Sequence, residues 1–488
     1  MKNPTAPARM LLLALLLFSY SCKEKDVIPA PAGTADNGDA ADTGYSAVNS
    51  WIYEVTEDAY YWYQHLPALA SLDLNASPSK FFEQLVYQRT ATDRFSTITD
   101  NIHELEDEFN GVSAIFGISY SIAYTDDAKS RIGLFISYVV NGSPAESAGI
   151  ARGDIITKIN DTQLTADNYY SLLSDSETIT FSKARLSGKE LLDSGISGTM
   201  TRAVVTENPI VFYNVIDKTA YGKKIGYLVY NQFLPGTGSN ENEYDDQLRS
   251  IFATFKQQDI NELVIDLRFN PGGYMSSAET LASLIGKNVG SGKIFYKEEW
   301  NSKYQAYFRR THGEASLSYP FLNEAGNVGS NISRVFVLTS NGTASASELV
   351  INGLAPYMEV ITIGENTYGK NLFGTLIDDE EERWDWGLYL MLGRVTNVNG
   401  ESDYGTVNGI TPTYYVEDNS IPYQPFGSDN ETLFKKVLEI MGIPAGSASR
   451  TAASAKVERL SRDYYRDGLK TRSKEMIRNW EVGVPPGR

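Results

Sequence analysis

The sequence predicts a multidomain protein of mixed α/β type, and three observations lead to this expectation. The chain has 488 residues, which is more than one compact hydrophobic core usually covers. Three apolar runs after residue 225 end in turns rich in glycine or small residues, and two of them lead into helix-like segments. The 40 Gly and 31 Tyr are typical of a chain with many turns and strands.

The composition excludes several classes of protein. With 42% hydrophobic and 21% charged residues, the chain is neither globally disordered nor a protein with many membrane spans. The net charge of −18 disfavours a nucleic-acid binder, which needs a basic face to meet phosphates. A single Cys excludes an internal disulfide. The three histidines show no metal-ligand spacing, so we expect no metal and no cofactor: His65, His103 and His312.

Residues 1–21 have the pattern of a secretory signal. Lys2 and Arg9 precede nine apolar residues, which are too few to span a bilayer. Because the run ends at the only Cys, the segment resembles a bacterial lipoprotein signal, with Ser19 where a Leu is usual. This resemblance implies acylation of Cys22, and the alternative is an ordinary signal with an incidental Cys.

Residues 22–44 are rich in Ala, Pro, Gly and Asp, and they are expected to form a flexible tether. The charged start at residues 22–26 resembles the export tags that send some lipoproteins to the outer surface. We therefore expect a protein of the bacterial cell envelope, attached to the outer membrane by a lipid anchor alone. Which face of the membrane it occupies stays open.

Residues 45–108 are expected to form a small helical domain or cap. Apolar and aromatic positions recur there at helical spacing, first around Trp51 and Ile52 and again around Phe81 and Phe82. Such a stripe is more often hydrophobic core than a ligand site, so we assign it to packing.

Residues 109–205 are expected to form a second unit. A strand over 132–140 runs into a turn and a short helix, and then into a second strand closed by a polar turn. The order of residues 142–160, GSPAESAGIARGDIITKIN, resembles the PDZ fold. That resemblance implies that Phe116, Gly117, Ile118 and Ser119 bind a peptide carboxylate with their backbone N–H groups, beside a strand edge that pairs with the peptide. The alternative for this tetrapeptide is a plain start of a strand.

The first chemical segment is a short apolar strand over 263–267 that reaches the turn Asn270-Pro271-Gly272-Gly273. Its glycines can adopt positive φ and bring backbone N–H groups close to a ligand. A helix is expected over 278–285, so these N–H groups would form an oxyanion site near a helix start. Taken alone, the segment is better explained as a structural turn.

The second chemical segment is a buried strand over 335–340, followed by small residues around Ser345 at the beginning of a helix. This position would expose the serine hydroxyl and offer the N–H of Ala346 to a developing negative charge. The alternative role for Ser345 is that of a helix N-cap.

The third chemical segment is a strand over 360–364 leading into a loop that ends at Lys370. Most lysines in loops are solvated. A lysine among apolar and small residues loses hydration of its charged form, so its pKa falls and the neutral amine can act as a base. With histidine so scarce, a serine activated by a neutral lysine is the economical hydrolase.

The segments DLRFNPGG, TASASE and GENTYGK, with a PDZ-like unit before them, resemble the carboxyl-terminal processing proteases, the S41 serine peptidases. The resemblance covers roughly residues 110–440 and implies a crotonase-like α/β core, here 206–446, that cuts proteins near their free C-termini. It makes Ser345 the nucleophile and Lys370 the general base, with Gly273, Gly272 and Ala346 at the oxyanion. The Gln that commonly orients the lysine is Gly374 here, so another residue orients Lys370 or a bare dyad operates.

The alternative function is a surface protein that binds peptides or glycans on a protease fold without cutting them. A small-ester hydrolase on the same core is a third class, but it would not need a carboxylate-binding domain. The last segment, 447–488, carries ten Lys and Arg against five Asp and Glu, unlike the acidic remainder of the chain. Val457, Leu460, Tyr464 and Leu469 recur near helical spacing, so we expect a terminal helix or tail, with docking on the acidic body as the alternative.

Overall fold

The computed structural model describes residues 44–187, 190–290 and 292–444, and, near the C-terminus, residues 455–456, 458–460, 464–467 and 476–478. The expected signal over 1–21, Cys22 and the tether up to residue 43 lie outside the described residues. Among the described helices, none combines the length and the apolar character needed to cross a bilayer. The mixed α/β class expected from the sequence is confirmed.

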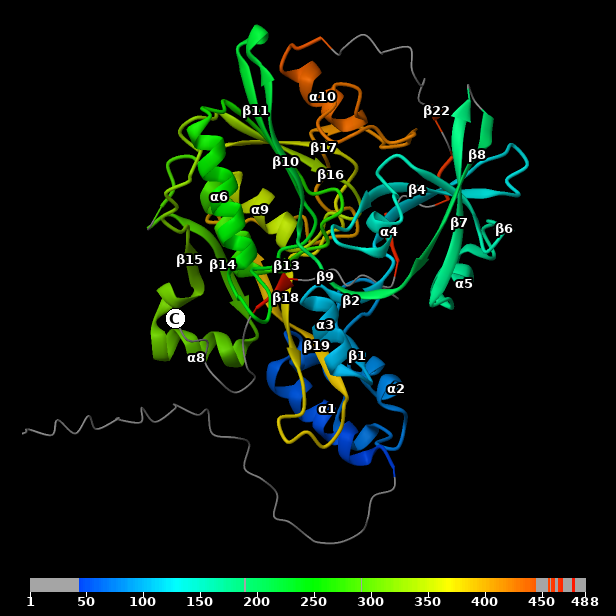
Figure 1. Cartoon of the computed structure of the whole chain (residues 1–488). Helices are drawn as coiled ribbons and strands as arrows, with labels where there is room; N and C mark the ends of the chain where they lie inside the picture. The colour runs from blue at the N-terminus through cyan, green and yellow to red at the C-terminus, as the bar shows by residue number, and fades with distance from the viewer. Residues whose placement is uncertain are drawn as a thin grey trace, which may run out of the picture.

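The N-terminal domain is helical, as predicted, and lies against the core at the bottom of Figure 1. Its Tyr60, Phe81 and Phe82 are fully buried and belong to the main hydrophobic core, so the aromatic stripe is packing. A short strand ties the domain to the core, because β1 pairs antiparallel with β19 (Gly387–Thr396). Its elements are α1 (Ser46–Ala59), the 3-10 turns Tyr63–His65 and Leu69–Ser71, α2 (Pro78–Glu83), β1 (Thr97–Thr99) and α3 (Ile102–Phe109).

The PDZ-like domain projects to the right in Figure 1 and has a hydrophobic core of its own. The chain enters through β2 (Val112–Ile115) and leaves through β9 (Ala203–Thr206), and these strands pair with each other. Between them, antiparallel pairs run in the order β3-β4-β5-β7-β8, with β6 beside β5. The elements are β3 (Ile118–Tyr124), β4 (Ile132–Val139), α4 (Pro144–Ser147), β5 (Ile155–Ile159), β6 (Thr162–Gln163), α5 (Tyr169–Ser174), β7 (Thr178–Ser187) and β8 (Glu190–Thr201).

The core is built on a six-stranded sheet that is parallel except for its first pair. Successive side chains of a strand point to opposite faces. Val335 and Val337 therefore join one hydrophobic cluster, and Phe336 and Leu338 join another with helix α10 (Thr432–Ile440). The strands are β10 (Ile210–Lys218), β11 (Lys223–Tyr230), β12 (Glu262–Asp266), β16 (Arg334–Thr339), β17 (Glu359–Gly364) and β20 (Tyr414–Tyr415).

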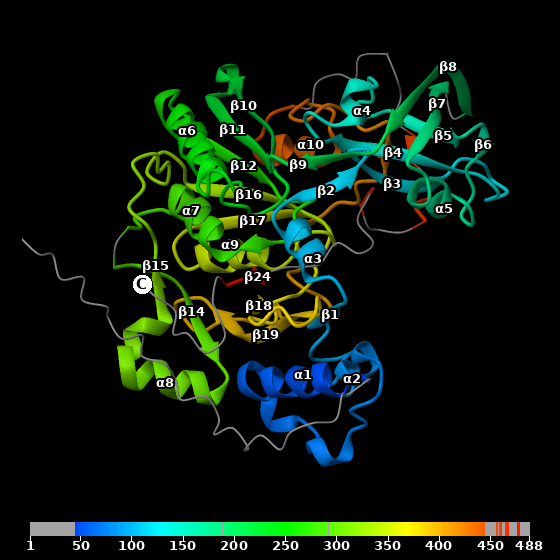
Figure 2. The ribbon, with the colours of Figure 1, turned by 60° about the horizontal axis from the view of Figure 1, so that its bottom comes forward.

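A second sheet lies across the helices of the core. Figure 2 shows α7 (Met275–Ile285) and α9 (Ala346–Leu354) between the two sheets, with α6 (Glu243–Gln257) beside them. The second sheet packs against α1 on its outer side and includes the short strand β24 from the C-terminal segment. Its strands are β13 (Gly273–Tyr274), β24 (Met476–Ile477), β18 (Leu372–Ile377), β19, β14 (Ile294–Trp300) and β15 (Ser318–Pro320), with α8 (Ser302–His312) following β14.

Two sequence expectations need correction. Helix α7 begins at Met275, three residues before the expected start, directly after the glycine turn. The helical interpretation of the C-terminal segment is wrong for its described residues, which form the short strands β22 (Ala455–Lys456), β23 (Tyr465–Arg466) and β24. Sheet edges elsewhere in the molecule supply their backbone partners, and β22, for example, pairs with β21 (Ser420–Ile421). Val457 and Leu469 lie outside the described residues.

Candidate active site

Ser345 lies at the N-terminus of α9, directly after the turn that leaves β16. Its φ of 61° is in the left-handed region, a strained conformation for a residue with a side chain. The residue is fully buried, and its position relative to Glu348 is that of a capping box. Yet Ser345 Oγ itself makes no hydrogen bond to any residue that the structure describes. The hydroxyl is thus buried at a helix start without being used in the hydrogen bonds of the fold.

Lys370 lies between β17 and β18 and is completely buried, not solvated as most loop lysines are. Its Nζ donates a hydrogen bond of 3.0 Å to the Tyr389 hydroxyl on β19. The same nitrogen lies 4.8 Å from the ring centre of Tyr389 and 5.1 Å from that of Phe95. The apolar surroundings expected for this amine from the sequence are therefore present.

The carboxylate of Glu348 connects the two segments that carry Ser345 and Lys370. Its Oε2 accepts the backbone N–H of Ser345 at 2.7 Å and that of Lys370 at 2.9 Å. Its Oε1 accepts the N–H of Gly369 at 2.7 Å and the hydroxyl of Thr367 at 2.5 Å. Burial raises the pKa of Glu348 to about 7, although these four hydrogen bonds oppose the shift. One buried side chain thus fixes the loop of the lysine against the helix of the serine.

The glycine turn after β12 is fastened to the same helix. The Asn270 carbonyl oxygen accepts the Ala344 N–H and the Ser347 hydroxyl, both at 3.1 Å. The N–H of Gly272, the second expected oxyanion donor, donates to Asn270 Oδ1 at 2.9 Å, so in this structure it already has an acceptor.

Gly273 stays a candidate oxyanion donor. Its φ is 132°, and a Cβ at this position would lie only 2.1 Å from the Phe233 carbonyl oxygen, so no larger residue fits there. Ala346 is the first residue of α9, and the N–H at that position has no acceptor within its helix.

The strand end that carries this turn is held by buried ions. Arg268 is fully buried and pairs with Asp266 at 2.6 Å and with Asp418 and Glu431, both at 2.7 Å. Burial alone would raise the pKa of Asp418, but Arg268 and Arg152 hold it below its ordinary value. The motif that precedes the glycine turn is therefore an anchor for the strand.

Position 374, where a Gln would orient the lysine, cannot hold a side chain in this chain. A Cβ there would lie 2.5 Å from the Leu390 carbonyl oxygen, and the pairing of β18 with β19 shifts register at this point. Tyr389 contacts the amine instead. Sequence reasoning missed both Tyr389 and Glu348. A signal existed for Glu348, because Ser345 and Glu348 have the spacing of a capping box, but none existed for Tyr389.

The loop assigned to peptide binding surrounds a carboxylate. The backbone N–H groups of Phe116, Gly117 and Ile118 all donate to the side chain of Asp467, at 3.1 Å from Gly117 and 2.6 Å from Ile118. Ser119 lies opposite Arg466 in the pairing of β3 with β23. The occupant of the loop is thus the C-terminal segment of the same chain.

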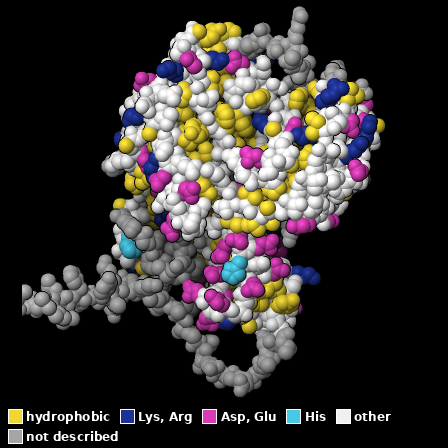
Figure 3. Space-filling model, viewed as in Figure 1, with side chains coloured by type: hydrophobic (Ala, Val, Ile, Leu, Met, Phe, Trp, Pro, Cys, Tyr) yellow, Lys and Arg dark blue, Asp and Glu magenta, His cyan; other side chains and the backbone are white. Residues whose placement is uncertain are grey.

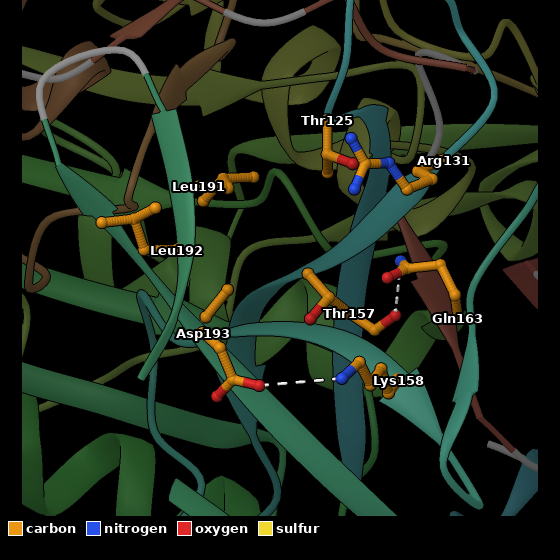
Figure 4. Close-up of a pocket in the computed structure, with 9 residues that line it drawn as sticks. Thr125, Arg131, Thr157, Lys158, Gln163, Leu191, Leu192 and Asp193 are labelled. Carbon is orange, nitrogen blue, oxygen red and sulfur yellow. Dashed lines mark hydrogen bonds and ion pairs between the residues drawn. The ribbon is translucent and has the colours of Figure 1, made fainter. Parts of the chain in front are cut away.

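Two surface features lie apart from these residues. Figure 3 shows acidic side chains gathered over the N-terminal domain, whose helix α3 has Glu104 and Asp107 exposed. Figure 4 shows a pocket on the PDZ-like domain, crossed by an ion pair of 3.7 Å between Lys158 and Asp193 and lined partly by Arg131. It contains none of the candidate site residues.

Comparison with known families matches all three parts of the chain. Residues 224–416 match Peptidase family S41, residues 47–97 match the Peptidase S41 N-terminal domain, and residues 135–181 match the PDZ domain. The assignments of the protease core, the helical N-terminal domain and the PDZ-like domain are confirmed at this level.

Two relatives with similar sequences are named as proteases. A probable CtpA-like serine protease of Staphylococcus aureus is 23% identical over 342 residues, covering 64% of this chain and 61% of the relative. A carboxyl-terminal-processing protease of Synechocystis is 26% identical over 303 residues, covering 62% and 63%. The chain thus spans less than two thirds of the length of these relatives.

The crystal structure of a putative S41 protease from Bacteroides fragilis superposes with a TM-score of 0.67 at 28% identity, covering 84% of this chain and 99% of that one. Residues 224–416 of this chain are thus a Peptidase family S41 domain, preceded by an S41 N-terminal domain and a PDZ domain.

Proposed function

We propose that the protein is a serine endopeptidase that cuts protein or peptide substrates near their C-termini. The observation that carries this proposal is the buried hydroxyl of Ser345, which has no hydrogen-bond partner among the described residues. Through Glu348 its backbone is joined to that of the buried Lys370. The Peptidase family S41 domain and relatives named as proteases support the same activity.

The reaction would begin with attack of Ser345 Oγ on the carbonyl carbon of the scissile bond. Burial disfavours the ammonium form of Lys370, so its neutral amine can take the serine proton. The N–H groups of Gly273 and Ala346 would hold the oxyanion of the tetrahedral intermediate. The protonated lysine then gives its proton to the leaving amine, and water hydrolyses the resulting ester of Ser345 by the same route.

Tyr389 would take the orienting role that Gln has elsewhere in the family. Its hydroxyl lies 3.0 Å from Lys370 Nζ, and its ring packs against the same group. Because β19 is a long strand of the second sheet, the hydroxyl has a fixed position. The amine is thereby restricted to few conformations, which favours productive proton transfer.

The PDZ-like domain would hold the tail of the substrate. Three N–H groups at Phe116, Gly117 and Ile118 converge on one carboxylate, which is the arrangement needed to bind a free C-terminus. The adjoining edge of β3 would pair with the extended peptide. A free C-terminal carboxylate with an apolar last residue is the expected recognition element, since apolar side chains surround the loop.

Activity is tested by cleavage of a protein with an unstructured C-terminal tail. Ser345→Ala should abolish cleavage, and Lys370→Arg should nearly do so, because an arginine keeps the charge but cannot act as a base near neutral pH. Lys183→Arg is the matched control, since this lysine belongs to the PDZ-like domain and pairs there with Asp154. If the wild-type chain binds tailed proteins but never cuts them, the alternative of a non-catalytic binding protein replaces the proposal.

Recognition is tested with two peptides that differ only at their end. An amidated C-terminus lacks the negative charge that the loop accepts, so it should be cut more slowly than the free acid. Equal cleavage rates for the two peptides would show that the terminal carboxylate plays no part in recognition, and they would not contradict the role proposed for Ser345.

We also propose that Cys22 carries lipid and anchors the enzyme to the outer membrane of a bacterial envelope. The support is the pattern of the first 22 residues and the tether-like composition after them. Because a single acyl chain holds a protein to a membrane only marginally, several chains would be needed.

A further inference from the structure

The C-terminal segment returns to the body of the protein at two functional places. Its first described part, residues 458–460 and 464–467, lies along β3 of the PDZ-like domain, and its second, residues 476–478, enters the second sheet of the core. In Figures 1 and 2 these parts appear in red beside β4 and between β13 and β18. Both places belong to the site proposed above.

At the PDZ-like domain the segment binds as an added strand. Tyr465 pairs with Tyr120 and Arg466 with Ser119, in antiparallel register. Further along the same edge, the Leu460 N–H donates to the Ile122 carbonyl oxygen at 2.8 Å. Strand addition to an open sheet edge is a common mode of peptide recognition.

The strand ends with its carboxylate in the binding loop. Asp467 is buried, its side chain accepts the N–H groups of Phe116, Gly117 and Ile118, and its own N–H donates to the Ile118 carbonyl oxygen at 3.2 Å. A peptide ligand would place its terminal carboxylate at this point. Here an aspartate side chain supplies the charge, so the chain can continue beyond the loop.

Side chains strengthen this docking. The rings of Tyr465 and Tyr120 stack with 6.0 Å between their centres. The Tyr464 hydroxyl donates to Asp418 at 2.6 Å, and the Arg459 guanidinium lies 4.7 Å from the centre of the Tyr464 ring. These contacts involve both the PDZ-like domain and the catalytic core.

At the catalytic core the segment occupies the space between two strands of the site. Met476 pairs with Gly273, the candidate oxyanion residue, and Ile477 pairs with Tyr274 on one side and with Gly374 on the other. The backbone N–H of Arg478 donates to the Gly374 carbonyl oxygen at 2.9 Å. An extended substrate would need the same strand edges beside the oxyanion turn.

A buried ion pair holds this end in place. Arg478 Nε lies 3.2 Å from Glu298 Oε1, and its Nη2 donates to the Tyr319 hydroxyl at 2.7 Å. The Glu298 side chain is fully buried, and burial raises its pKa while Arg478 opposes the shift. Because a buried carboxylate is costly unless it is paired, the ion pair of Glu298 with Arg478 indicates a specific contact of the C-terminal segment.

We propose that the C-terminal segment is an intramolecular ligand: its described residues 458–460 and 464–467 occupy the peptide-binding loop and the edge of β3, and residues 476–478 occupy the strand edges beside Gly273, so that a substrate binds only after displacing it. This inference rests on the peptide-binding role given to the loop in the proposed function. The polarity of the segment distinguishes it from a substrate. A substrate held by its terminal carboxylate presents residues N-terminal to its anchor, whereas this segment presents residues C-terminal to Asp467.

The test measures binding apart from cleavage. A fluorescent peptide with a free C-terminal carboxylate and an apolar last residue is titrated into the full chain carrying Ser345→Ala, and its anisotropy gives the Kd. Adding Asp467→Ala removes the carboxylate that the loop holds. The peptide should then bind at least ~10-fold more tightly, because the competing closed state is depopulated.

The matched control is Glu458→Ala, which removes the same charge from the same segment. The carboxylate of Glu458 pairs at the surface with Lys129 at 2.6 Å, away from the peptide-binding loop and from the strand edges beside Gly273. The Kd of the peptide for this variant should stay within about twofold of its Kd for the Ser345→Ala parent, because exposed ion pairs contribute little to stability. A second variant that ends at residue 444 should bind at least as tightly as Asp467→Ala.

An unchanged Kd in the Asp467→Ala chain, or an equal gain from Glu458→Ala, would overturn the inference. The same holds if the peptide binds none of the variants. Ser345-dependent cleavage of a tailed protein, measured separately with the active chain, would in each of these cases still support the peptidase. Loss of that cleavage with an intact Asp467 effect would refute the peptidase and leave the intramolecular ligand standing.

Discussion

Replacing Glu348 by Gln changes the connection between Ser345 and Lys370, the proposed nucleophile and base, with almost no change in shape. The carboxylate accepts four hydrogen bonds, two at each oxygen, whereas an amide offers one accepting oxygen and one NH2 group. Whichever way the amide turns, at least one backbone N–H faces another donor. We expect the amide nitrogen to lie toward Thr367, whose hydroxyl can turn to accept, which leaves the N–H of Gly369 without an acceptor.

The expected loss of stability follows from the unpaired N–H of Gly369 in the variant. A buried donor without an acceptor costs about 1–3 kcal/mol, so the variant should fold with its free energy of unfolding lowered by this amount. The loop that ends at Lys370 would shift to relieve the conflict. Since a misplacement of ~1 Å can cost ~100-fold in rate, kcat/KM should fall by about two orders of magnitude.

The pH dependence gives a second readout. Because burial raises the pKa of Glu348 to about 7, the folded chain binds this proton more tightly than the unfolded chain does. The wild type therefore loses stability from this group as the pH rises from about 4.5 to about 7, by up to about 3 kcal/mol. The glutamine does not titrate, so the gap in unfolding free energy between wild type and variant should be smaller at pH 8 than at pH 5.

Urea unfolding at pH 5 and pH 8, together with peptide cleavage at pH 8, measures both effects. Asp245→Asn is the matched control, because burial raises the pKa of Asp245 to about 6, and this residue of α6 contacts Thr280 rather than the site. It should alter the stability curve in the same direction and leave cleavage unchanged. Normal cleavage by Glu348→Gln, or a gap that widens with pH, would refute the role given to this carboxylate.

Three further changes test other parts of the structure. Tyr389→Phe removes the hydrogen bond to Lys370 and should lower kcat about 10-fold while leaving KM and unfolding nearly unchanged; an unchanged kcat would show that the amine needs no such partner. Arg268→Met removes the arginine that three buried carboxylates share, although Glu431 keeps its ion pair with Arg152, and it should lower the free energy of unfolding by about 3–5 kcal/mol in urea; a loss below ~1 kcal/mol would contradict the anchoring role. Cys22→Ser should leave the membrane fraction of cells or stay as unprocessed precursor, and a mature variant in the membrane at normal amount would remove the lipid anchor.

Much of the catalytic core could be predicted because its signals are local. The strand before Ser345, the small residues around it and the helix after it follow one another within the sequence, and so do the strand and turn that end at Gly273. Side-chain alternation and turn chemistry operate over a few residues, so the sequence carries them directly. The same holds for the turn and short helix of the PDZ-like domain around Pro144.

The partners of those residues could not be predicted, because pairing between distant strands decides them. Tyr389 reaches Lys370 only through the register of β18 with β19, which shifts at Gly374. The sequence also did not show that the N–H of Gly272 donates to the side chain of Asn270, because the surrounding packing decides how that side chain turns.

The C-terminal segment shows most clearly which features the sequence determines and which the tertiary structure decides. Its basic composition and near-helical spacing are visible in the sequence, and they favour a terminal helix or tail, with docking on the acidic body as the alternative. A short segment takes the conformation for which its surroundings supply partners, and here these are open sheet edges. Asp467 lies 351 residues after Phe116, and no local pattern connects them. The sequence by itself therefore determined the candidate site residues and the elements that carry them, while only the tertiary structure decided what contacts each of them, because those contacts join segments that are far apart along the chain.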